Sequence, residues 1–378
     1  MKAQFSGADI RLVGHPFVST GVADHLRASM RALRAAGMAP TLCDIYGIGR
    51  GDDPALLDEF KGALKPGLSA DINLFHINGD EVAQALAHLR DPRFAEASNI
   101  ILPVWELPRY PSQWAEALSQ FDEVWASSEF IASALSNVVA RPVRLMPQAV
   151  APALTQHLGR RALGIPDHVT AFLFFFDLSS YIARKNPFQV IEAFKALVAR
   201  HPREPAHLIL KFKGSLAQDT TGAQLRDAVG AISDQVQLIE GALPDHVVKN
   251  LVRNADCFIS LHRSEGFGRG LAEAMALEVP VIATGYSGNL TFMRPENSRL
   301  VACRQVAVGP GEYPHWEDQS WAQPELEDAV AAMEDILLCR TRVLEKARQA
   351  RLDMAMNFSS LAMGTRYAER LREVMAPA

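Results

Sequence analysis

The chain has 378 residues, a length that suits two domains of ordinary size better than one compact core. Its 48% hydrophobic and 21% charged residues match a soluble globular protein, and a formal net charge of -5 argues against a nucleic-acid binder, which would carry a strong basic excess. The start lacks the apolar run of a signal peptide, no stretch approaches the ~18 apolar residues of a membrane span, and the 4 cysteines show no paired or metal-ligand spacing, so a cytoplasmic protein is expected.

The first 150 residues alternate strand-like and helix-like segments. A short apolar run at 10–13 is followed by a helical stripe over 21–36. Further strand-like runs, separated by segments that can form helices, occur at 41–46, 72–76, 99–104 and 123–126. This alternation predicts parallel strands joined by right-handed crossovers, with ligands bound at the carboxyl ends of the strands. Residues 1–150 are therefore expected to form one Rossmann-like domain.

Several polar residues stand where these strands are expected to end. Gly21 closes a strand-to-helix loop that could bring backbone N–H groups close to a ligand. His76 follows the third strand and could be either a hydrogen-bonded interior residue or a functional one. Trp105 and Glu106 follow the fourth strand, where a bulky aromatic residue and a carboxylate have no obvious packing purpose. Ser128 fits the N-cap of the next helix.

Arg27, Arg31 and Arg34 share a second face of the helix predicted over 21–36, at spacings i, i+4 and i+7. A solvated face is enough to explain a few charges without an exposed aromatic partner. The alternative is contact with a charged acceptor or with anionic lipid headgroups, so that peripheral contact with the inner face of the membrane stays a hypothesis.

Residues 146–167 carry 3 prolines among small and polar residues, a composition typical of a connection between domains. Beyond this connection the alternation resumes. Strand-like runs occur at 172–176, 208–212, 236–239, 257–261 and 279–284, which predicts a second open parallel sheet. Residues 165–355 are expected to form this second domain, and residues 356–378 offer a final helix.

Two cations stand at the first strand-to-helix corner of the second sheet. Arg184 and Lys185 come just before Pro187, a residue that suits the first turn of a helix. Cations ahead of a helix N-terminus are unfavourable on dipole grounds unless an anion lies there. An ordinary surface pair is the alternative, but the location favours phosphate binding.

The stretch 264–277 lies between two strand-like runs and so forms the strand-to-helix corner of a βαβ unit. Its glycines, each costing roughly 1 kcal/mol relative to alanine within a helix, place the helix start near Gly270. Glu265 then lies on the loop and Glu273 in the first helical turn, so both carboxylates can face one crevice. Loop N–H groups and the helix N-terminus favour a diphosphate between them, which suits a nucleotide sugar. The alternative is that these glutamates only complement a helix N-terminus.

The segment EGFGRGLAEAM, which begins at Glu265 and precedes a strand and a glycine-containing turn, resembles the E-x7-E signature of glycosyltransferase family 4, in the GT-B superfamily. The resemblance implies an α/β fold of the GT-B type, with two Rossmann-like domains whose parallel sheets face a central cleft. Residues 1–150 would be the acceptor domain and residues 165–355 the nucleotide-sugar donor domain. Residues 356–378 would be a C-terminal helix that returns to the N-terminal domain.

The same resemblance assigns roles within the donor site. Glu265 would contact the transferred sugar and Glu273 the ribose hydroxyls. Lys185 matches the family's lysine on the donor diphosphate, whereas the usual arginine position falls at or near Ser179, so that Arg184 could supply that cation or the site could rely on one charge plus backbone amides. The other donor-binding candidates, in the glycine loop and at further strand ends, are Gly266, Phe267, Gly268, Gly21, Glu240, Gly241, Gly288 and Asn289.

The contact between the N-terminal domain and the reacting sugar stays open. Better-known family members place a histidine after the fourth strand, where this sequence has Trp105 and Glu106. Either Glu106 or His76 could make the catalytic contact. Tyr313 and Trp316, in an insertion rich in proline and glycine, could form an acceptor wall or simply fill the loop.

These features imply a retaining glycosyltransferase, expected to be a hexosyltransferase, that moves a sugar from a nucleoside diphosphate sugar to a hydroxyl of a glycan or lipid-linked acceptor, as in polysaccharide assembly. No cofactor is expected, and the lack of an Asp-x-Asp motif predicts metal independence. A nucleotide-sugar isomerase and a noncatalytic nucleotide-sugar-binding protein would use the same scaffold and remain alternatives. A nicotinamide-dependent oxidoreductase is remote, because no G-x-G-x-x-G follows the first strand.

Overall fold

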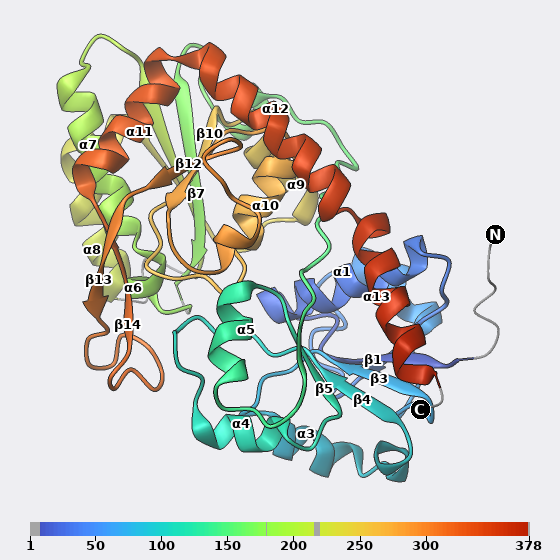
Figure 1. Ribbon diagram of the computed structural model, residues 1–378. Coiled ribbons are helices and arrows are strands. Elements are labelled where there is room, and N and C mark those ends of the chain that lie inside the picture. Colours follow the sequence, from blue (N-terminus) through green and yellow to red (C-terminus); the bar gives the residue numbers. More distant parts are fainter. Residues whose placement is uncertain (1–7, 179, 215–219, 377–378) are drawn as a thin grey trace. The chain divides into compact units, whose positions relative to one another are not determined.

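The computed structural model describes residues 8–178, 180–214 and 220–376. The chain divides into two compact units (Figure 1): a first unit formed by Met1–Ala151 with Met356–Ala378, and a second unit formed by Pro152–Ala355. Each unit is built on its own sheet of parallel strands, with helices in the connections. The predicted α/β class with two Rossmann-like domains is therefore confirmed.

Short apolar runs form the sheet of the first unit. Its six parallel strands stand in the order β2-β1-β3-β4-β5-β6. Their bounds are β1 Ile10–Gly14, β2 Thr41–Asp44, β3 Ile72–Phe75, β4 Ser98–Ile101, β5 Glu123–Ala126 and β6 Val143–Leu145. Leu12 in β1 lies between Leu42 of β2 and Leu74 of β3, and all three side chains are fully buried. Such continuous apolar strands are typical of a parallel sheet that is covered on both faces.

Helices connect these strands and complete the first unit. They are α1 Gly21–Ala35, α2 Pro54–Phe60, α3 Val82–Leu89, α4 Ser112–Leu118, α5 Glu129–Ser136 and α13 Ser360–Met375. α1 begins where the hydroxyl of Thr20 accepts a hydrogen bond from the backbone N–H of Ala23 at 3.3 Å. α13, drawn in red in Figure 1, packs so closely on α1 that a Cβ on Gly364 would lie 1.9 Å from the carbonyl oxygen of Ala32. The chain thus returns to the first unit after it completes the second.

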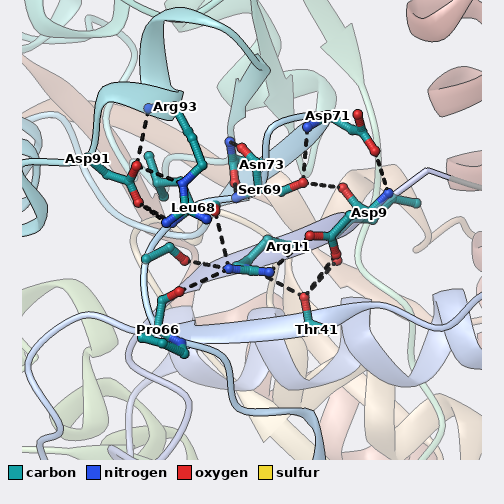
Figure 2. A network of polar contacts seen from close by, with 12 residues as sticks. Asp9, Arg11, Thr41, Pro66, Leu68, Ser69, Asp71, Asn73, Asp91 and Arg93 are labelled. Carbon is teal, nitrogen blue, oxygen red and sulfur yellow. Dashed lines mark hydrogen bonds and ion pairs between the residues drawn. The ribbon is translucent and has the colours of Figure 1, made fainter.

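A polar network pins the amino ends of β1 and β2 (Figure 2). The buried guanidinium of Arg11 donates to the hydroxyl of Thr41 at 3.0 Å and to three successive carbonyl oxygens of residues 66–68 at 2.8 to 3.2 Å. Asp91 accepts from the N–H of Leu68 at 2.7 Å, and hydrogen bonds from Arg93 lower the pKa of Asp91 to about 2. This network anchors the loop before β3 at the edge of the sheet opposite to the carboxyl ends, so its role is structural.

The sheet of the second unit also has six parallel strands, in the order β12-β11-β10-β7-β8-β9. Their bounds are β7 Thr170–Asp177, β8 Ala206–Lys213, β9 Val236–Glu240, β10 Cys257–Ser260, β11 Val281–Thr284 and β12 Arg299–Val301. Phe172 and Phe174 in β7 are both buried, and they stand opposite Leu208 and Leu210 of the neighbouring strand β8. The carboxyl ends of β7, β10 and β11 therefore lie at one edge, with β10 between the other two.

The helices of the second unit are α6 Ile182–Lys185, α7 Pro187–Arg200, α8 Thr220–Val229, α9 Asp245–Asn254, α10 Arg269–Ala276, α11 Leu326–Leu338 and α12 Arg340–Asn357. Short 3-10 turns lie in the first unit at Lys61–Ala63 and Pro92–Ala95, and in the second unit at Arg160–Leu163, Gly230–Gln235 and Gly288–Thr291. An antiparallel hairpin of β13 Cys303–Ala307 and β14 Ser320–Pro324 was not predicted. Neither strand alternates regularly between buried and exposed residues: β13 has no buried residue, and β14 buries the adjacent Trp321 and Ala322, so the sequence pattern does not reveal them.

Candidate functional site

The glycine loop between β10 and α10 is held against the loop that follows β11. The backbone N–H of Gly288 donates to the carbonyl of Glu265 at 2.9 Å, and the hydroxyl of Ser287 accepts from the N–H of Glu265 at 2.8 Å. Gly268, with φ at +89°, takes a left-handed conformation directly before α10, which starts at Arg269. The predicted helix start near Gly270 is thus correct to within one residue. The two loops form one backbone unit at the ligand edge of the sheet.

We expect Gly288→Ala to destabilise the protein, because a Cβ at this position would lie 2.0 Å from the carbonyl oxygen of Gly266. Backbone atoms cannot move aside cheaply, so the free energy of unfolding should fall by about 2 kcal/mol. Urea unfolding of the full chain checks this value. The matched control is Gly21→Ala, whose Cβ would meet no atom within 4 Å, and which should not lower the free energy of unfolding. Equal stability of the two variants would contradict the packing argument.

Glu265 lies between the two cations that the sequence singles out. Its carboxylate is 2.5 Å from Nζ of Lys185 and 3.4 Å from Nη1 of Arg184. Burial alone would raise the pKa of Glu265, but the charges of Lys185 and Arg184 outweigh it and lower the pKa to about 2. Glu265 is therefore a carboxylate at neutral pH. The structure brings these three candidate residues into direct contact.

The corner that carries the cations is tied to β10. Arg184 and Lys185 end the one-turn helix α6, and α7 begins at Pro187, as predicted. The guanidinium of Arg184 donates to the carbonyl of Ser264 at 3.1 Å and to the hydroxyl of Ser180 at 2.8 Å, and its side chain is buried. Ser179, near the position of the family's usual arginine, lies outside the described residues. Arg184 thus occupies the edge of the sheet where a second cation was expected.

Glu273 is the fifth residue of α10, just beyond the first helical turn in which it was predicted, and it is 4% exposed. Its carboxylate contacts Nζ of Lys249 at 2.5 Å and Nε of Arg269 at 3.1 Å. Lys249, in α9, also lies 3.2 Å from Asp245. Burial would lower the pKa of Lys249, but Glu273 and Asp245 together raise it. The two signature glutamates are therefore bound to different cations, Glu265 to those of α6 and Glu273 to those of α9 and α10.

Lys249 and Arg269 were not among the predicted site residues. Arg269 stands four residues before Glu273, the spacing at which side chains meet on one face of a helix, so this partner could have been inferred from the sequence. Lys249 belongs to another helix, and no local pattern connects it to Glu273. The tertiary fold alone reveals that the second glutamate is a buried member of a charge cluster.

The remaining donor-site candidates lie at the same edge of the second sheet. Asn289 is fully buried; its Oδ1 accepts a hydrogen bond from Nε2 of His262 at 3.1 Å, and its Nδ2 donates to the carbonyl of Thr284 at 3.0 Å. These contacts give Asn289 a role in shaping the loop. Gly241, with φ at +89°, follows the exposed Glu240 at the end of β9. Gly266 and Phe267 belong to the glycine loop, where the ring of Phe267 packs 5.0 Å from that of Phe292.

His76 in the first unit is completely buried. Its Nε2 lies 3.1 Å from the hydroxyl of Ser29, its Nδ1 lies 3.3 Å from the carbonyl of Leu74, and its ring meets that of His25 edge-on at 5.0 Å. Burial lowers the pKa of His76 to about 3, so the imidazole is neutral at physiological pH. Of the two roles open to His76, the contacts support that of a hydrogen-bonded interior residue.

The buried state of His76 predicts a pH dependence of stability. The pKa of His76 is about 3 in the folded protein, and its ordinary value is 6.5. Between these two values the imidazole of His76 is protonated in the unfolded chain and neutral in the folded one. Stability contributed by the neutral ring is present above pH 6.5 and is lost below it, by about 1.4 kcal/mol per pH unit. When the pH falls from 7.5 to 5.5, the free energy of unfolding of His76→Gln, measured with urea, should therefore fall by about 1.4 kcal/mol less than that of wild type.

A matched control for this measurement is His168→Gln, which removes an exposed imidazole. It should lose as much stability as wild type over the same pH interval. If His76→Gln does so as well, the ring of His76 is not held neutral in the folded state.

Trp105 has a packing role, contrary to expectation. It is 2% exposed, its indole N–H donates to the carbonyl of Arg109 at 2.9 Å, and its ring meets Tyr110 and Trp114 edge-on at 5.7 and 5.3 Å. The expectation that this aromatic residue has no packing purpose is wrong, because the loop after β4 forms a small aromatic core of its own. Glu106 beside it is partly exposed.

Three further residues gather at the carboxyl ends of the first sheet. His15 follows β1, Tyr46 follows β2, and Glu81 precedes α3. Nε2 of His15 contacts the carboxylate of Glu81, and the ring of His15 stacks on that of Tyr46 at 5.2 Å. Gly21, the predicted candidate nearby in the sequence, is the exposed first residue of α1. The position of His15 and Tyr46 after strand ends is the signal by which they could have been found.

The basic face expected on α1 is smaller than its sequence indicates. Arg27 is 6% exposed and donates to the carbonyls of Pro16 and Val18 at 2.6 and 3.1 Å, so it offers no charge to a surface. Arg31 forms a bidentate pair with Glu59 at 2.6 and 2.7 Å. No helix in the described part of the chain is long and apolar enough to cross a membrane.

Comparison with known families concerns the second unit. Residues 164–306 match the model of the family described as Glycosyl transferases group 1. The matched segment begins just before β7 and ends in β13, so it contains Arg184, Lys185, Glu265 and Glu273. All the charged contacts described above for the second unit, from Lys185 to Glu273, therefore lie within the part that the family shares.

Several solved structures match nearly the whole chain. HepE from Anabaena, in complex with UDP and glucose, has a TM-score of 0.70 at 14% identity, covering 97% of this chain and 99% of its own. Sucrose-phosphate synthase from Thermosynechococcus elongatus has a TM-score of 0.69 at 16% identity, covering 98% and 100%. A glycosyltransferase from Rickettsia africae has a TM-score of 0.71 at 14% identity, covering 98% and 99%. Residues 164–306 are therefore similar to the glycosyl transferases group 1, and nearly the whole chain shares the two-domain α/β fold of these solved structures.

Proposed function

We propose that this protein is a glycosyltransferase that transfers a sugar from a nucleoside diphosphate sugar to an acceptor hydroxyl, with retention of the anomeric configuration, as a member of family 4. The observation that carries the proposal is the convergence of Lys185 and Arg184 on Glu265 beside the glycine loop. A charged pair alone would be ordinary. Here it lies at the carboxyl ends of β7 and β10, the edge at which parallel sheets bind their ligands.

The donor diphosphate would exchange places with the carboxylate as the partner of the two cations. Lys185 and Arg184 would neutralise the charge that develops on the diphosphate as the glycosidic bond breaks, and N–H groups at the start of α10 would add to this. Glu265 draws both cations to one point, so the diphosphate would find them side by side once the carboxylate turns away. This preformed geometry is what makes a phosphate site the best reading of the cluster.

The two glutamates would then recognise the two ends of the donor. Glu265, released from part of its contact with Lys185, would accept hydrogen bonds from the transferred sugar. Glu273, held by Lys249 and Arg269, would accept from the ribose hydroxyls. Glu240 and Gly241 after β9 would lie near the base. The second unit, over 165–355, would thus be the donor domain.

The first unit would bind the acceptor. Residues 1–150, with the C-terminal helix within 356–378, would present Gly21 and Glu106 together with the contact of His15, Glu81 and Tyr46. Aromatic faces and carboxylates are suitable partners for a glycan or a lipid-linked sugar in polysaccharide assembly. No cofactor and no metal would be required, since the diphosphate charge would be met by Lys185, Arg184 and backbone N–H groups.

A thermal-shift screen with UDP, GDP, ADP and their sugar conjugates tests the donor class. One nucleoside diphosphate is expected to raise the melting temperature, with UDP tried first because HepE was solved with it. Turnover with a panel of sugar acceptors then follows, with the product anomer read by NMR. Consumption of the nucleotide sugar without an acceptor would indicate an isomerase, and binding without turnover a sensor. Binding of no nucleotide at all would overturn the proposal.

A further inference from the structure

The hairpin β13–β14 is fastened to the end of β10. The backbone N–H of Ala322 donates to the carbonyl of Arg263 at 2.9 Å, and Nε of Arg263 donates to the side chain of Gln323 at 3.1 Å. The guanidinium carbon of Arg263 also lies 5.3 Å from the ring centroid of Trp321. Since Arg263 stands two residues before Glu265, these contacts fix the base of the hairpin beside the candidate donor site.

The loop of the hairpin, residues 308–319, is closed by its own contacts. The N–H of Val308 donates to the carbonyl of Gln319 at 3.0 Å, and the N–H of Gly309 donates to the carboxylate of Glu312 at 2.7 Å. The same carboxylate lies 3.5 Å from Nη1 of Arg263. The loop is thus a built element, and the residue that follows Glu312 has a defined place.

That residue is Tyr313, and it covers Arg184. Tyr313 is 6% exposed, its ring centroid lies 6.0 Å from the guanidinium carbon of Arg184, and it packs at 4.8 Å on the ring of Tyr181. Tyr181 has φ at +55°, a strained conformation for a tyrosine, in the residue that opens α6. Arg184 thus contacts the carboxylate of Glu265 as well as an aromatic ring.

We propose that Tyr313 is a positioning residue that holds Arg184 ready for the donor diphosphate. When Glu265 turns to the transferred sugar, Arg184 loses part of its anionic anchor. An aromatic ring attracts the cation through its face and takes up none of the five N–H donors of the guanidinium. The ring therefore does not compete for these donors with oxygen acceptors, which are the carbonyl of Ser264 and the hydroxyl of Ser180 in the structure and would include phosphate oxygens when the donor binds. This inference rests on the proposed role of Arg184, and it assigns to the hairpin a task in catalysis in place of acceptor binding.

Kinetics of Tyr313→Leu and Tyr313→Phe in the full chain test the proposal, with the nucleotide sugar selected by the screen. Tyr313→Leu should lower kcat about tenfold while the acceptor KM stays unchanged, because leucine fills the space without a ring quadrupole. Tyr313→Phe keeps the ring and should restore kcat to within about twofold of wild type. A raised acceptor KM at unchanged kcat would mean that Tyr313 is an acceptor wall, and would overturn the proposal.

A double-mutant cycle without any ligand separates this inference from the proposed function. The melting temperatures of Tyr313→Leu, Arg184→Gln and the double variant are compared with wild type. The double variant should lose less than the sum of the single losses, because each change removes the same contact. Additive losses would overturn the positioning role even in an active enzyme. Coupled losses in a protein that binds no nucleotide would uphold the contact and overturn the proposed function.

Discussion

Lys185→Ala is expected to lower kcat for sugar transfer by about 100- to 1,000-fold, the range seen when a preorganised group that stabilises transition-state charge is removed. The ammonium of Lys185 lies 2.5 Å from the carboxylate of Glu265, nearer than the guanidinium of Arg184 at 3.4 Å. Without it, the departing diphosphate would be met by Arg184 and backbone N–H groups alone. Steady-state kinetics with the nucleotide sugar selected by the screen measures the effect, and the donor KM should rise as well.

Lys195→Ala is the matched control for this variant. Lys195 lies on α7, one element further along the chain, and pairs with Glu192 at the surface. Its removal should change kcat by less than about twofold, because a surface ion pair within one helix contributes little free energy. Lys185→Arg keeps a cation and should recover part of the activity. If Lys185→Ala transfers sugar at the rate of wild type, the diphosphate is bound elsewhere and the site assignment is wrong.

Glu273→Ala is expected to weaken nucleoside diphosphate binding by about 10- to 100-fold and to destabilise the protein by about 3 kcal/mol. The first effect reflects lost hydrogen bonds from ribose hydroxyls to a charged acceptor. The second arises because Lys249, 8% exposed, would be left buried without its closest carboxylate. Isothermal titration and urea unfolding measure the two effects separately.

Two further variants separate the role of Glu273 in the fold from its role in binding. Asp245→Ala removes the second carboxylate that contacts Lys249. Because the side chain of Asp245 is 69% exposed, this change should lower the free energy of unfolding by less than about 1 kcal/mol and leave nucleotide affinity unchanged. Glu273→Ala combined with Lys249→Met removes the buried charge together with its partner and should recover most of the stability. Nucleotide affinity should stay low in that double variant. If affinity returns with stability, Glu273 does not contact the ligand.

The central part of the candidate site could be predicted because its signals are local. Gly266 and Gly268 disfavour a helix, so the sequence places Glu265 on a loop and Glu273 on the helix that follows, of which Gly270 is the second residue. Pro187 marks the start of α7 in the same way and leaves Arg184 just ahead of it. Apolar runs such as that of β7 indicate a covered parallel strand without further information.

Contacts between distant segments could not be predicted. Nothing near Trp105 in the sequence shows that the loop after β4 buries its indole, and nothing in α1 shows that Arg27 reaches the carbonyls of the preceding loop. The hairpin β13–β14 was missed because neither strand alternates regularly between buried and exposed residues. A charged or aromatic residue has the same local pattern whether it faces solvent or a partner.

By itself, the sequence determined the α/β class and the two sheets, and it placed Glu265 on a loop, Glu273 on the next helix and Lys185 just ahead of α7, since backbone preferences and apolar periodicity act over a few residues. Only the tertiary structure decided their partners. Lys249 reaches Glu273 from another helix, and Tyr313 reaches Arg184 from a hairpin more than a hundred residues away along the chain. The physical reason is that ion pairs and ring contacts depend on distances in space, which are set when the sheet brings the carboxyl ends of its strands to one edge.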